Sequence, residues 1–325
     1  MGEFGLSREE IERFNTLFSK RYAIIGNTVI TFMRSDLKKI LAICLKDAKK
    51  LPYPERDFTR QEMADISYQF LRDTDIDLYL NLLNILRDPA VKTYMTEPSP
   101  NNRDEDNYNS AGLNGRILSI SPKNNAGGLI QVCHELSHML SQRMQKNMSA
   151  RDHTIGEIEA LFIEKIFAQY LKDNGIISQY EFDAYKSFRN YKLAADTAEC
   201  IMRHAVFSLT DGNIDEEKIS KLVRYTGNQM IPDYVLPTLK KMANPNLGYN
   251  PAERYVLGEA VSSLLFEEYK KDKEGTMEKF KNFLSHNAQI TYKDATQELL
   301  GKRLKDVSHD FLDFVEREHD ESEKD

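Results

Sequence analysis

The segment from residue 129 to residue 142, LIQVCHELSHMLSQ, constrains the fold more than any other part of this sequence. Its apolar residues recur at the three- and four-residue spacing of one face of an α-helix. Glu135 is the one Asp, Glu, Lys or Arg residue in the segment. A helix with this composition would expose a large apolar surface if it lay in water. The sequence therefore predicts a buried helix, around which the rest of the chain has to pack.

Two histidines on this predicted helix have the spacing of a metal site. His134 and His138 are four residues apart, so both side chains project from one helix face, about one turn from each other. Two imidazoles in this arrangement can bind one zinc ion, at about 2.0–2.1 Å each. Glu135 follows the first histidine and can reach a metal-bound water as a general base. Because a buried cluster of this kind is costly to desolvate without a metal, the pattern indicates a metal site.

A third protein ligand is expected from residues 152–164, DHTIGEIEALFIE. A second helix is predicted to begin near Thr154. Glu157 then lies one turn inside this helix, and Glu164 lies seven residues further along the same face. Apolar residues surround that face, and a buried carboxylate needs a cation as its partner. The sequence therefore favours Glu157 as the third ligand.

The same segment leaves alternatives open. His153 could be the third ligand instead, although it precedes the predicted helix. Asp152 or Glu164 could hydrogen-bond a ligand histidine and so orient it. Glu159 is rotated away from Glu157 and is expected in solvent, as most acidic side chains are.

The charge and composition exclude several classes of protein. The 325-residue chain has 44 Lys+Arg against 51 Asp+Glu and a formal charge of −7, whereas a nucleic-acid-binding protein usually has a basic surplus. No apolar stretch reaches the length of about 18 residues that a membrane-spanning helix needs. The N-terminus has no apolar signal core, and the three widely spaced cysteines favour a reducing compartment. We therefore expect a cytoplasmic protein without nucleic-acid or membrane partners, while delivery by a non-classical secretion route stays open.

The remaining patterns predict a mostly α-helical fold with a small β-sheet before the helix of residues 129–142. Thr59 and Glu62 have the spacing of a capping box at a helix start. Residues 76–86, IDLYLNLLNIL, have the composition of a buried helix, and residues 116–121, RILSIS, are the clearest strand. We expect an N-terminal helical region at 1–112, a catalytic helical region with the zinc site at 113–315, and a charged, frayed tail at 316–325.

Three stretches of the chain match, in the same order, the sequence motifs of a known family. They are CHELSHML at 133–140, GEIEALFIE at 156–164, and YVLGEA at 255–260 with the LLFEEYKKD, EKFKNFLS and ATQELLGKRL that follow it. They resemble the HELGH-type helix, the AEVAS…NE pattern and the C-terminal YATG, FL and LL..G elements of one family. That family is the zinc oligopeptidases of the oligoendopeptidase F and thimet oligopeptidase type (gluzincins). Over about residues 115–306, this chain therefore resembles a shortened member.

The resemblance implies a nearly all-helical peptidase that has a deep channel, a short sheet beside the active-site helix, and peptides rather than folded proteins as substrates. It also implies that residues 117–121 form an edge strand, to which an extended substrate adds by main-chain pairing. In that family the ligand glutamate precedes a second acid by seven residues, as Glu157 precedes Glu164. Tyr255, which matches the last tyrosine of the family motif, and Tyr249 are candidates for hydrogen-bonding the developing oxyanion. The chain departs from the family in having about half its usual length.

The sequence thus predicts a zinc-dependent metallopeptidase with one Zn²⁺ per chain. His134, His138 and Glu157 would hold the zinc, while Glu135 would take a proton from the attacking water and return it to the leaving amine. The expected partner is a peptide or an unfolded protein. Two alternatives stay open: a metalloprotease toxin or effector with one protein target, and a metal-stabilised binding protein without catalysis. Glu135 argues against the second, because zinc binding alone does not require it.

Overall fold

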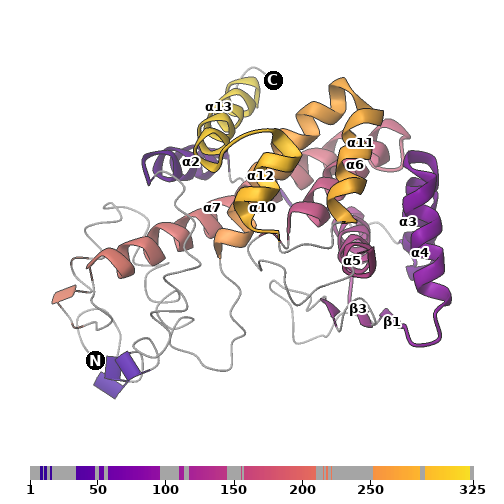
Figure 1. Ribbon diagram of the computed structural model, residues 1–325, viewed down its shortest axis with the longest axis horizontal. Helices are drawn as coiled ribbons and strands as arrows, with labels where there is room; N and C mark the ends of the chain where they lie inside the picture. Colours follow the sequence, from indigo (N-terminus) through magenta and orange to yellow (C-terminus); the bar gives the residue numbers. More distant parts are fainter. Residues whose placement is uncertain are drawn as a thin grey trace. The chain divides into compact units, whose positions relative to one another are not determined.

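The computed structural model describes residues 34–47, 51–54, 58–95, 110–112, 117–144, 157–209, 252–285 and 290–322, with a few isolated positions besides (Figure 1). These residues divide between two compact units. Unit 1 comprises Met1–Ala48, Asn190–Val256 and Val315–Asp325, and unit 2 comprises Lys49–Arg189 and Leu257–Phe314. The predicted regions 1–112 and 113–315 do not coincide with these units and stay a prediction about domains.

The described elements are mostly α-helices. In chain order they are α2 (Arg34–Asp47), α3 (Arg60–Thr74), α4 (Ile76–Arg87), α5 (Ala126–Met144), α6 (Ile158–Asp173), α7 (Gln179–Leu209), α10 (Ala252–Lys271), α11 (Lys273–Leu284), α12 (Tyr292–Leu300) and α13 (Leu304–Ser322). Three short strands, β1 (Lys92–Met95), β2 (Ser110–Gly112) and β3 (Ile117–Ile120), precede α5. This confirms the predicted fold class. No helix in the described part of the chain is long and apolar enough to cross a membrane.

The helices α3 and α4, which lie side by side in unit 2, begin where the sequence places capping residues (Figure 1). Thr59 and Glu62 form the predicted capping box: the Thr59 hydroxyl accepts a hydrogen bond from the Glu62 N–H, and the Glu62 carboxylate accepts one from the Thr59 N–H at 2.7 Å. The Asp75 carboxylate accepts two backbone N–H groups at the start of α4. Ile76 and Leu80 are 53% and 49% exposed, so α4 is amphipathic rather than wholly buried.

The three strands form one sheet in the order β1-β3-β2. The central strand β3 pairs in parallel with β1 and antiparallel with β2, so that Ser119 lies opposite Tyr94 on one side and Ser110 on the other. The prediction that residues 117–121 form an edge strand is therefore wrong. Among the described residues, the edges of the sheet belong to β1 and β2. The alternation of side chains along a strand could not show this, because it reports the two faces of the strand and not its neighbours.

The core of unit 2 is built around α5 and α6. From Ile158 through Glu164 every residue of α6 is buried, and α5 contacts α6, α3, α4 and the strands β2 and β3. The first turn of α5 is joined tightly to the segment that leaves β3. The Asn125 side chain accepts a hydrogen bond from the Gly128 N–H at 3.0 Å, and a Cβ at Gly128 would overlap the carbonyl oxygen of Lys123. This close approach holds α5 against the sheet.

The last helix, α13, continues through most of the segment that was expected to be a frayed tail. It runs to Ser322, so the expectation for residues 316–325 is wrong over 316–322, while 323–325 lie outside the described residues. In unit 1, Val315 is buried and the His319 ring contacts the Asp47 carboxylate of α2 at 2.7 Å. These contacts anchor a segment whose charge alone suggested a solvated end.

Candidate metal centre

The helix α5 presents His134 and His138 from one face, as their four-residue spacing predicts. Their rings lie edge to face, with centroids 4.8 Å apart and an interplanar angle of 86°. Their side chains are 15% and 11% exposed. Most of the surrounding helix is buried, including Val132, Leu136 and Met139. The two imidazoles therefore reach a small polar site at the edge of an otherwise apolar helix.

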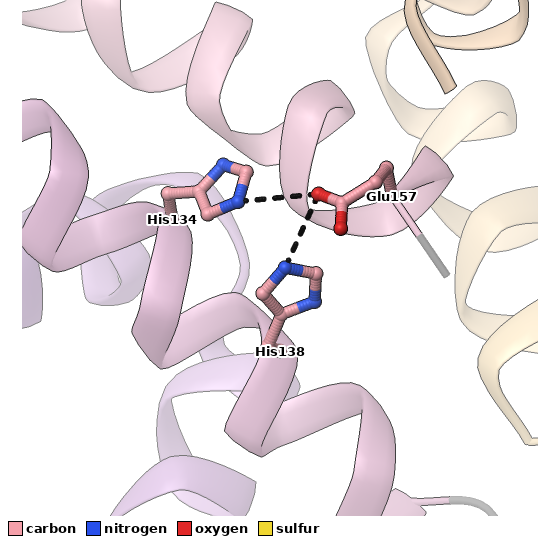
Figure 2. A group of neighbouring side chains, drawn as sticks. All are labelled: His134, His138 and Glu157. Atoms are coloured by element: carbon pink, nitrogen blue, oxygen red, sulfur yellow. Dashed lines mark ion pairs between the residues drawn. The ribbon is translucent and has the colours of Figure 1, made fainter. Parts of the chain in front are cut away.

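Glu157 completes this site from the start of α6, as Figure 2 shows. One carboxylate oxygen, Oε2, lies 3.4 Å from Nε2 of His134 and 3.4 Å from Nε2 of His138. Glu157 is the residue before the helix and makes no side-chain capping bond, so its position one turn inside a helix was predicted wrongly. Its carbonyl accepts the N–H of Leu161 at 3.0 Å, which starts the hydrogen bonding of α6. The carboxylate is thus held at a helix end and turned toward the histidines.

The three side chains fit the dimensions of a zinc site. Their candidate ligand atoms all lie within 4.8 Å of one another. Two ligand atoms on a tetrahedral zinc ion, each at about 2.0–2.1 Å, are about 3.3–3.4 Å apart. Both distances from the Glu157 oxygen to the histidine nitrogens have this value. A set of two histidines and one glutamate is also a typical donor set of catalytic zinc, which keeps one position open. These residues can therefore hold a metal ion between them.

Glu164 orients one of the two histidines from behind. Its Oε2 lies 2.6 Å from Nδ1 of His134, the ring nitrogen that faces away from Glu157. A ring N–H at Nδ1 can donate to this carboxylate, and with a metal bound Nε2 would then offer its lone pair to the ion. Glu164 is one of the two residues that the sequence predicts for this role. Asp152, the other one, and His153, the alternative third ligand, lie outside the described residues.

Three further charged side chains, which the sequence did not reveal, extend this contact away from His134. Arg189 of α7 lies between Glu164 and Glu259 of α10, and Lys165 contacts Glu259 as well. One of them left a signal in the sequence: Glu259 is the only charged residue in the run from residue 256 to residue 266, just as Glu135 is in its own helix. Arg189 left no such signal, because its neighbours along the chain are largely polar.

In this cluster, contacts between opposite charges favour the charged forms of His134, Glu164 and Glu259. Burial lowers the pKa of His134, but its contacts with Glu157 and Glu164 outweigh this and raise the pKa to about 10 in the metal-free protein. Burial raises the pKa of Glu164 and of Glu259, whereas the Arg189 guanidinium lowers both, and the net result is a lowered pKa for Glu164 and a pKa of about 2 for Glu259. Both carboxylates are therefore ionised at neutral pH, despite their burial.

Two glutamates next to the proposed ligands are also buried. Glu135 is 7% exposed, in keeping with its place on α5. Glu159 is 1% exposed, so the expectation that it lies in solvent is wrong. The first turns of α6 are buried on every side, and the helix therefore has no solvated face at that point. A sequence pattern that separates two faces of a helix cannot recognise one that is covered all round.

Of the two tyrosines predicted to hydrogen-bond the oxyanion, the described residues include Tyr255 but not Tyr249. Tyr255 is half-buried in the first turn of α10, in the part that belongs to unit 1, with the Arg254 guanidinium 5.9 Å from its ring centroid. The proposed ligands, by contrast, all belong to unit 2. A role for either tyrosine in stabilising an oxyanion stays a prediction.

The fold and the site together define a mostly helical protein that carries a candidate metal centre of two histidines and one glutamate. Two solved structures share this fold. A candidate peptidase from Chlamydophila abortus matches 97% of this chain with a TM-score of 0.58 and 14% identity. A candidate oligoendopeptidase F from Bacillus anthracis strain Ames matches 97% of it with a TM-score of 0.59 and 10% identity. The chain spans 56% of the length of each. No family model matches the chain, and no curated protein sequence matches it.

Proposed function

We propose that this protein is a zinc-dependent peptidase that cuts extended peptides. One observation carries the proposal: a single oxygen of Glu157 lies 3.4 Å from the Nε2 atoms of both His134 and His138, which is the separation that tetrahedral zinc requires. The fold supports the same function, because the two solved structures that share it are described as candidate peptidases.

Each residue of the site has a distinct role in this proposal. His134, His138 and Glu157 hold the metal ion, and Glu164 fixes the ring of His134 through Nδ1. The bound zinc acts as a Lewis acid and lowers the pKa of water. Glu135, which follows His134 on α5, takes a proton from the attacking water and returns it to the leaving amine. Glu135 is 7% exposed, so it lies largely away from bulk solvent.

The substrate proposed is a peptide or an unfolded segment of protein. The strands β1 and β2 form the edges of the sheet in the described residues, and an extended peptide can add to such an edge by main-chain pairing. Of the two, β1 is mostly exposed, which leaves room for an added strand. Residues 117–121 do not offer such an edge, because β3 is paired on both sides.

The test combines metal analysis with a peptide-library digest. We expect about one zinc per chain in the purified protein, cleavage of library peptides, and loss of cleavage after chelation. Cleavage of one protein target without cleavage of the library would instead indicate a dedicated toxin or effector. Bound metal without any cleavage would indicate a binding protein. A protein that neither contains a transition metal nor takes up added zinc would contradict the proposal as a whole.

A further inference from the structure

Behind His134 of α5 lies a cluster of four buried charged side chains from three other helices. Glu164 and Lys165 belong to α6, Arg189 to α7 and Glu259 to α10, and all four residues lie in unit 2. Their side chains are between 7% and 15% exposed. Of these residues, Glu164 alone contacts a proposed metal ligand, His134 of α5. The cluster therefore begins at the metal centre and extends away from it.

Both oxygens of each carboxylate are engaged. Glu164 contacts Nδ1 of His134 through Oε2 and Nε of Arg189, at 3.7 Å, through Oε1. Glu259 contacts Arg189 through Oε2 and Lys165 through Oε1. The hydrogen bond at Oε2 of Glu164 and the ion pair at its Oε1 together favour one orientation of this carboxylate. The position of the Glu164 carboxylate, and with it the ring plane of His134, therefore depends on Arg189.

The charges of the cluster also balance. Two carboxylates face two cations, and Arg189 lies between the carboxylates. A planar guanidinium has donors that point in several directions, so it can contact two acids at once, whereas a lysine ammonium on a flexible stem is less suited to this. Removal of Arg189 would leave Glu164 buried without its cation, which is costly.

We propose that Arg189, itself held by Glu259, is a positioning residue of the metal centre that acts on His134 through Glu164. The inference rests on the proposed function, because it requires His134 to be a metal ligand. Outer hydrogen-bond partners of a ligand histidine fix its ring orientation and its basicity, and loss of such a partner typically weakens metal binding by about 10–100-fold. Here the partner is a carboxylate that is itself oriented by a second ion pair.

The experiment measures zinc affinity by competition with a chelator in four proteins: wild type, Glu164→Gln, Arg189→Met and the double variant. We expect each single variant to bind zinc about 10–100-fold more weakly than wild type. If Arg189 acts through Glu164, the double variant should bind zinc about as weakly as Glu164→Gln alone, because the second change removes nothing further. Losses that multiply in the double variant would show that Arg189 acts by another route and would overturn the inference.

A second readout reports the geometry of the site. In the cobalt-substituted protein, the visible absorption bands should shift in Arg189→Met, because the ring of His134 is no longer held at one orientation. Lys279→Met is the matched control: it removes an ion pair of Lys279 with Glu268 in the same unit, away from the site, and should change neither zinc affinity nor spectrum. If Arg189→Met does not fold, as judged by circular dichroism, the same four-protein comparison is made with Arg189→Lys. This variant keeps the charge and should weaken zinc binding less than Arg189→Met.

The outcomes separate this inference from the proposed function. If wild type binds zinc and the Arg189 variants bind it equally well with an unchanged cobalt spectrum, the inference is wrong and the proposed metal centre stands. If wild type binds no zinc, both are wrong.

Discussion

Glu157 combines two properties that rarely occur together. It is 2% exposed, and it precedes the first residue of a helix without capping that helix through its side chain. An acidic residue at such a position usually interacts with the free N–H groups of the first helical turn. Here the carboxylate oxygen Oε2 instead lies between two imidazoles. The local backbone therefore directs this side chain toward a cation site rather than toward its own helix.

Replacement of Glu157 tests the ligand assignment. In Glu157→Ala we expect zinc affinity to fall by more than the 10–100-fold that is typical for an outer partner, because one of three ligands is lost. Glu159→Ala is the matched control, since Glu159 is equally buried two residues further on. Metal content after dialysis against a weak chelator gives the comparison. Loss of zinc in Glu159→Ala with full content in Glu157→Ala would move the third ligand by two residues.

Replacement of Glu135 separates catalysis from metal binding. Glu135→Gln keeps the shape of the side chain and can hydrogen-bond water, but it cannot accept a proton. We expect wild-type zinc content and a decrease in kcat of about 100-fold or more, the scale of general acid–base catalysis. Single-turnover cleavage of a fluorogenic peptide, together with elemental analysis, measures both quantities. Undiminished cleavage by zinc-loaded Glu135→Gln would assign the general base to another residue.

At the scale of the element, α10 supports the metal centre by close contact. A Cβ at Gly258 would lie 2.7 Å from Cβ of Glu157 and 3.2 Å from its carbonyl carbon. The next residue of the same helix, Glu259, holds Arg189. Gly258 therefore packs against the proposed ligand Glu157, and Glu259 holds the ion pair that lies behind the proposed ligand His134. The strand β3 is less directly involved: because it is paired on both sides, Ser119→Pro would weaken the sheet.

Gly258→Ala tests this contact. The added methyl group requires α10 or Glu157 to move, which typically costs about 1–3 kcal/mol of stability when a well-packed core cannot yield. We also expect weaker zinc binding, because Glu157 is displaced from the histidines. Gly275→Ala makes the same change at an exposed position on α11, where the nearest atoms belong to the Asp272 side chain. Thermal melts and zinc titrations of the two variants give the comparison, and unchanged zinc affinity in Gly258→Ala would show that this packing does not position the ligand.

At the scale of the whole molecule, the metal centre lies within one compact unit that two separate segments of the chain build. His134, His138, Glu157, Glu164 and Arg189 come from Lys49–Arg189, and Gly258 and Glu259 come from Leu257–Phe314. The three proposed ligands come from one segment, but the residues that support them come from both, so the supported site forms only after the two segments have packed together. A metal that binds the assembled site and not the unfolded chain must stabilise the fold.

Thermal unfolding with and without zinc measures this coupling. At a free zinc concentration of 100 times the dissociation constant, we expect a gain of about 2.7 kcal/mol in the free energy of unfolding, which is lost on chelation. The His138→Ala variant should show little of this gain, because it retains two of the three ligands. An equal gain in His138→Ala would place the stabilising zinc elsewhere on the chain.

The sequence by itself determined the features that depend on neighbours along the chain. The buried helix around His134 and His138, the capping box of α3 and the mostly helical fold follow from periodicity and residue type. Glu157 and Glu164 could be named as partners of the histidines, because seven residues separate them and apolar side chains surround both.

Tertiary structure decided the features that depend on residues far apart in the chain. It made β3 a central strand, covered the first turns of α6 on all sides so that Glu159 is buried, and placed Arg189 and Glu259 behind Glu164. In each case the cause is a contact between separate elements of the chain, and the periodicity of a single element does not encode such a contact. Periodicity tells which face of an element is apolar, and only the packed structure tells what lies against it.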